Sequence, residues 1–172
     1  STYPAAKRQE VTNVFREMLA LYGRVEQQYG LPKNDLAGAM AMFILTNHIA
    51  YGGVDQPPEV IAPLAAQLRS AMASNPQIAE TSDREKQEAF EQFAIIGMFT
   101  EATRLALQQQ PNPTISANLK TAGGDYLQTL LKIDPATMRF SKNGLSVTST
   151  GGGVGIAQGG SAPTGKAAAK PS

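Results

Sequence analysis

The chain has 172 residues, of which 42% are hydrophobic and 17% charged, and its formal net charge at pH 7 is +1. This length suits one domain that buries a core without metals or disulfides, and the absence of cysteine excludes disulfides, thiolate metal sites and a cysteine nucleophile. The balanced charge gives no basic surface for nucleic acid or anionic lipid, and no apolar run reaches the roughly 20 residues that span a bilayer.

The first expected helix covers residues 4–29. Its apolar residues recur at steps of three and four, which places them on one face: Val11, Phe15, Met18, Tyr22, Val25 and Tyr29. Gly30 is well placed as the C-terminal cap, and Pro32 prevents continuation of the helix. The segment therefore predicts an amphipathic helix.

The second expected helix begins near Asn34 or Asp35, which are both good N-cap residues, and runs to residues 52–53. It is apolar nearly all round, which is typical of a helix buried at the centre of a domain. Three polar residues interrupt this apolar run, and they are Thr46, Asn47 and His48. Polar groups in a core are costly unless they are paired, so these three need hydrogen-bond partners or a function.

The third and fourth expected helices lie between residues 57 and 110. A Pro-led segment starts the third helix, and the pair Asn75–Pro76 ends it. The fourth helix opens with Ser82 and Glu85, which form the pattern of a capping box, and it runs to about residue 110.

The fifth expected helix covers residues 114–132. Gly123–Gly124 lies in its middle, at a cost of about 1 kcal/mol per Gly relative to Ala, which favours either a close helix crossing or a break. Residues 138–147 then alternate with period two around Asn143–Gly144, a strong turn signal, and predict a small two-stranded hairpin that must lean on the helices. Residues 148–172 are rich in Gly, Ser, Ala and Pro and should form a disordered tail.

The fold class expected from these elements is all-α: one bundle-like domain of about five helices over residues 1–147, with a small C-terminal β-hairpin. The candidate contact residues for a ligand or partner are Asn47, His48 and Gln87. We expect Asn47 to be buried and paired outside its own helix, for example with Gln87 or Gln92, and to serve packing more than ligand contact. Thr46 should bond back to a preceding carbonyl.

His48 is the only histidine, and it has no second His and no carboxylate four residues on. A catalytic or metal-binding role needs such partners, so we interpret His48 as a hydrogen-bonded structural residue near the end of a buried helix. The carboxylate pairs resemble solvated helix faces, and Gly151–Gly155 lacks the Gly-Lys-Ser/Thr sequence that a phosphate loop needs. The sequence therefore predicts no catalytic residue, no metal site and no cofactor.

Across residues 11–147 the order of these elements and motifs resembles a group of exported proteins of Gram-negative bacteria that are classified as a domain of unknown function. The positions that carry the resemblance are Asn34, Asp35, Ala37, Asn47, Gly52, Lys86, Gln87, Leu130 and Gly144. The resemblance implies export to the periplasm or the medium and a signal peptide cleaved before Ser1, in keeping with a chain that starts without Met. It implies no activity.

Three functional hypotheses follow. The first is an exported, non-enzymatic binding or structural module that acts through contacts with another protein, without nucleic acid or membrane insertion. The second is a helical bundle that binds a small molecule or lipid between Met- and Phe-rich faces of the second and fourth helices, oriented by Asn47 or His48. The third is an enzyme that uses His48. A pocket with convergent polar groups would favour the second hypothesis, and a solid core with an exposed apolar patch would favour the first.

Overall fold

The computed structural model describes residues 4–148 and confirms one mostly helical domain closed by a two-stranded antiparallel hairpin. In chain order the elements are α1 (Ala5–Tyr29), α2 (Leu36–Gly52), the 3-10 turn η1 (Pro58–Val60), α3 (Ile61–Ala73), α4 (Pro76–Glu80), α5 (Asp83–Gln109), α6 (Pro113–Leu131), the 3-10 turn η2 (Pro135–Thr137), β1 (Met138–Ser141) and β2 (Gly144–Val147). The described part of the chain thus has six α-helices where about five were expected.

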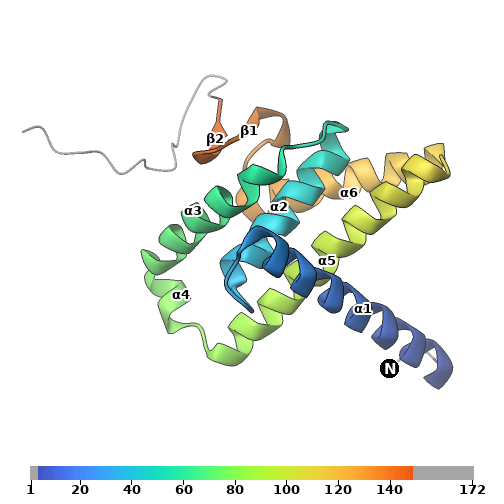
Figure 1. The fold of residues 1–172 in the computed structure, drawn as a ribbon, viewed down its shortest axis with the longest axis horizontal. Helices are drawn as coiled ribbons and strands as arrows, with labels where there is room; N and C mark the ends of the chain where they lie inside the picture. Colours follow the sequence, from blue (N-terminus) through green and yellow to red (C-terminus); the bar gives the residue numbers. More distant parts are fainter. Residues whose placement is uncertain (1–3, 149–172) are drawn as a thin grey trace, which may run out of the picture.

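Helix α2 lies at the centre of the domain and packs against α3, α5 and α6 (Figure 1). Two glycines allow the neighbouring helices to reach its backbone. A Cβ at Gly97 on α5 would lie 3.1 Å from the Cα of Phe43, and a Cβ at Gly123 on α6 would lie 2.6 Å from the backbone oxygen of Asn47. The sequence left two alternatives at Gly123, a close helix crossing or a break. Because α6 continues through Gly123 without a break, the close crossing is confirmed.

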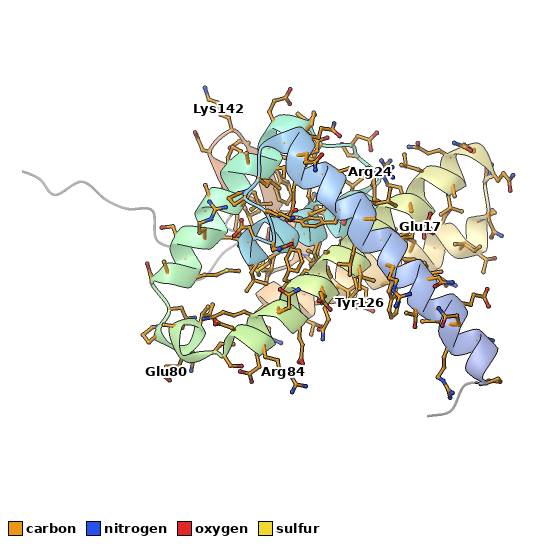
Figure 2. The ribbon with its side chains drawn as sticks, turned by 60° about the horizontal axis from the view of Figure 1, so that its bottom comes forward. Glu17, Arg24, Glu80, Arg84, Tyr126 and Lys142 are labelled. Atoms are coloured by element: carbon orange, nitrogen blue, oxygen red, sulfur yellow. The ribbon has the colours of Figure 1, made fainter. Side chains whose placement is uncertain are left out.

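Helix α1 packs on the domain with only its C-terminal half. Met18 and Tyr22 are buried, and the Tyr22 ring meets the Phe90 ring of α5 edge-on at a centroid distance of 5.6 Å. Every residue from 7 to 17 is exposed, and the N-terminal turns extend past the other helices (Figure 1, Figure 2). The amphipathic pattern predicted the helix correctly, but the apolar face of the N-terminal half is not covered by the rest of the domain.

Helix α4 is the element that the sequence did not predict. The side chain of Asn75 accepts a hydrogen bond from the Gln77 amide at 3.0 Å, and Pro76 occupies the first turn of the helix. An Asn cap followed by proline is a helix start as well as a stop for the preceding helix. With only five residues, α4 is too short to show a hydrophobic period.

Helix α5 begins with the predicted capping box, in which the Ser82 side chain accepts from the Glu85 amide at 3.3 Å and Glu85 Oε2 accepts from the Ser82 amide at 3.0 Å. We expect Ser82→Ala to lower the free energy of unfolding by about 1 kcal/mol, since it leaves an amide of the first turn without its acceptor. Urea titration followed by circular dichroism measures this. Ser116→Ala, an exposed position inside α6, is the control and should change stability by less than about 0.5 kcal/mol. Equal effects of the two variants would show that the cap does not matter.

The hairpin pairs Phe140 with Leu145, and its turn places Gly144 at a φ of 95°, a conformation that favours glycine. As expected, it leans on the helices. Gln67 of α3 donates from Nε2 to the Leu145 carbonyl at 3.0 Å and accepts from the Leu145 amide at 2.7 Å. This side-chain amide therefore makes the two hydrogen bonds that a neighbouring strand would make.

The expected tail, residues 148–172, lies outside the described residues except for Thr148. The Thr148 amide donates to the Thr137 carbonyl at 2.9 Å. This first residue of the expected tail therefore still belongs to the hairpin.

Candidate functional site

The three candidate contact residues do not converge on one site. Asn47 and His48 are adjacent on α2, and Gln87 lies near the start of α5. Gln87 is exposed and donates from Nε2 to Glu91 Oε1, one turn along its own helix, at 2.8 Å. It is therefore not the partner of Asn47.

Asn47 is 1% exposed, as predicted, but the expected partner outside its own helix is wrong. Its Nδ2 donates to the Phe43 carbonyl on α2 at 2.8 Å. Thr46 does the same through Oγ1, which donates to the Met42 carbonyl at 2.9 Å, and this bond was predicted. Both polar side chains bond back along the helix, so neither Gln87 nor Gln92 is needed to pair the Asn47 amide.

His48 joins α2 to the segment that leads into the hairpin. Its Nε2 lies 3.2 Å from the Pro135 carbonyl oxygen, and its ring meets the Phe140 ring at a centroid distance of 4.9 Å. Nδ1 is buried and has no hydrogen-bond partner among the described residues. Burial lowers the pKa of His48, the Pro135 hydrogen bond opposes this shift, and the positive charge of Arg139 adds to it. With Nε2 engaged and Nδ1 buried, the ring is not placed to exchange a proton with a substrate.

A hollow of about 310 Å³ lies beside this contact, between the end of α2, α6 and η2. It is lined by Tyr51, Lys120, Thr121, Gly124, Asp125, Gln128, Asp134 and Pro135. The Lys120 ammonium lies 5.9 Å from the centroid of the Tyr51 ring, near the outer limit for a cation–π contact. The volume is at the lower end of the range for ligand sites.

A second hollow, of about 270 Å³, contains Arg104. The guanidinium bonds Glu101 through Nε at 2.9 Å and through a terminal nitrogen at 2.8 Å, and it pairs with Asp55 at 2.9 Å. The hydrogen bonds to Glu101 raise the pKa of Arg104. Because two carboxylates already neutralise this charge, Arg104 is better suited to holding the loop after α2 on α5 than to binding an anion.

The most exposed apolar feature of α1 is what we call the α1 face, formed by Val11, Val14 and Phe15. These side chains are 40%, 36% and 47% exposed, respectively, and they continue the stripe that Met18 and Tyr22 bury against the domain. The sequence predicts the apolar stripe, but it does not show that the N-terminal part of this stripe is left uncovered. Packed and unpacked turns of a helix have the same 3.6-residue apolar period, so the period does not indicate which turns the domain covers.

No three His, Asp or Glu side chains within residues 4–148 lie close enough together to hold a metal ion. Among the helices of these described residues, none combines the length and the apolar composition that a membrane span requires. Over residues 4–148 the fold and these side chains define a small helical domain closed by a hairpin, with an exposed apolar helix face and surface hollows such as those beside Pro135 and Arg104.

The chain belongs to a family of unknown function, DUF6683, which matches residues 1–148. This confirms the part of the resemblance that placed it in such a family, and the match says nothing of export. No curated protein and no solved structure matches the chain.

Proposed function

We propose that this domain is a non-enzymatic module that binds another protein through the α1 face. The observation that carries the proposal is the combination of exposure and geometry. Val11, Val14 and Phe15 form an exposed apolar strip on the N-terminal turns of α1, and these turns extend past the other helices (Figure 1). Helices that present apolar side chains at such spacing are recognised by apolar grooves of partner proteins.

The other two hypotheses receive less support. Neither hollow is lined by a Met or Phe side chain, by Asn47 or by His48, which were the residues expected to hold a small molecule or lipid. An enzyme based on His48 would need a free ring nitrogen, and Nε2 is engaged by Pro135 while Nδ1 is buried.

The proposal includes export to the periplasm or the medium, which rests on the resemblance to exported bacterial proteins. Fractionation of cells of the source organism, probed with an antibody to the domain, tests it. Recovery with periplasmic or secreted marker proteins supports export, and recovery with cytoplasmic markers contradicts it.

Phe15→Ser should abolish partner binding and should lower the free energy of unfolding by only about 1 kcal/mol, because the side chain is 47% exposed and only its covered half is lost from the domain. The binding test replaces Phe15, or Asn13 as the matched control on the opposite side of the same turns, with a photo-crosslinking amino acid in the source organism. We expect one discrete crosslinked protein from position 15 that is absent from position 13, identified by mass spectrometry.

Equal crosslinking from both positions, or none from position 15, would contradict the proposal. A crosslink to a second copy of the domain would identify the partner as self, and sedimentation of the purified parent and Phe15→Ser over a range of concentrations would check this.

A further inference from the structure

The segment from η2 to β2 is held on the helices by hydrogen bonds from two of them and by apolar side chains packed on the core. Gln67 of α3 makes both of its hydrogen bonds to Leu145, and His48 of α2 contacts Pro135 and Phe140. Met138 is 1% exposed and supplies the main apolar anchor of β1. A two-stranded hairpin is marginal by itself, so its attachment depends on these contacts.

The hydrogen bond to the Pro135 carbonyl determines which protonation state of the His48 ring is compatible with this contact. A carbonyl oxygen only accepts hydrogen bonds, so the proton of the neutral ring must be on Nε2, and Nδ1 must be bare. A second proton would place an N–H at Nδ1, where the atom is buried and no acceptor lies within reach among the described residues. Such an unpaired, charged donor is unfavourable while the η2–β2 segment is packed on His48.

The charged groups around His48 do not make its protonation favourable while the segment is packed on it. Arg139 on β1 is the charged group that acts on the ring directly, and its positive charge opposes a second one. Asp134 precedes η2 and accepts from the Ala136 amide, while Lys120 and Asp125 of α6 border the hollow beyond Tyr51 with opposite charges.

From this geometry we propose that the η2–β2 segment is an acid-sensitive latch, closed on neutral His48 and opened when His48 is protonated. In the open form the ring is in water and binds a proton with the ordinary pKa of histidine, about 6.5. The closed form binds the proton less tightly. Stability of the closed form is therefore complete above about pH 6.5 and falls as the pH drops below that value, until the closed form also protonates.

The Leu145 amide reports the latch directly, because it donates to Gln67 across the attachment. Hydrogen exchange of this amide, expressed as a protection factor at each pH, should fall by up to about 30-fold between pH 7.5 and pH 5 if closed His48 stays neutral. The Leu45 amide, inside α2, should keep its protection factor. In His48→Gln, which retains a donor for Pro135 and cannot titrate, the Leu145 protection factor should not depend on pH.

A Leu145 protection factor that is independent of pH in the parent overturns the proposal, as does the same pH dependence in His48→Gln. Arg139→Gln keeps the test decisive if His48→Gln loses the hairpin. Removing the positive charge lets the closed form bind the proton more tightly, so the fall in the Leu145 protection factor between pH 7.5 and pH 5 should be smaller than in the parent. The bonds that Arg139 also donates to the Ala136 and Met138 carbonyls are lost at both pH values alike, so the ratio of the two protection factors isolates the charge, and a fall as large as in the parent counts against the latch.

Discussion

Gly123→Ala should destabilise the domain by about 1–3 kcal/mol, even though alanine is the better helix former by about 1 kcal/mol. The added Cβ would lie 2.6 Å from the backbone oxygen of Asn47, and that oxygen belongs to the central helix. Neither helix backbone can yield without disturbing the packing of α2 against its other neighbours. Urea unfolding of the purified variant measures the change.

The matched control is Gly23→Ala in α1, where a Cβ would meet no atom within 4 Å. The same substitution there should stabilise the protein by up to about 1 kcal/mol, because alanine loses less backbone freedom on folding. Two substitutions of one type should thus have opposite signs. Stabilisation by Gly123→Ala would show that α6 does not cross α2 as closely as described.

Asn47→Leu should destabilise by about 1–3 kcal/mol, and by more than His48→Gln. The physical reason is overfilling. Asn47 is 1% exposed and lies where α2 crosses α6 at Gly123, so a larger side chain overfills the site. The lost hydrogen bond contributes less, because Asn47 donates to a carbonyl of its own helix and its loss leaves no group on another element unpaired. His48 is only half-buried and near the end of α2, where a glutamine can be accommodated.

Denaturant unfolding of both variants, with Asn47→Ala as the control, separates volume from hydrogen bonding. Asn47→Ala removes the amide without adding volume, so it should cost less than Asn47→Leu if overfilling dominates. If Asn47→Leu proves as stable as the parent, the structural interpretation of Asn47 fails and the segment 46–48 regains its place as a candidate functional site.

The long helices could be predicted because their signals are local. Apolar period, Ser82 and Glu85 at a helix start, and Gly30 at a helix end each act within a few residues. Gly123 is an intermediate case: its sequence position indicated either a crossing or a break, and only the approach of Asn47 decides between them.

The candidate site was harder to predict because its determinants are far apart in the chain. His48 is hydrogen-bonded to the carbonyl of Pro135, which lies 87 residues later in the chain, and no spacing rule predicts that the two residues meet. For Asn47 the sequence indicated burial correctly, but the cost of an unpaired amide does not say which carbonyl will accept from it. The nearest one, on Phe43, suffices.

The attachment of Leu145 to Gln67 also bears on self-association. A strand at the edge of a sheet offers unpaired amides and carbonyls to any extended chain that it meets, which is a common route to aggregation. In this domain the outward amide and carbonyl of Leu145 are already occupied by a side chain that belongs to a helix and therefore cannot propagate a sheet. Gln67 thus blocks the edge of β2 at this residue against the addition of strands from other molecules.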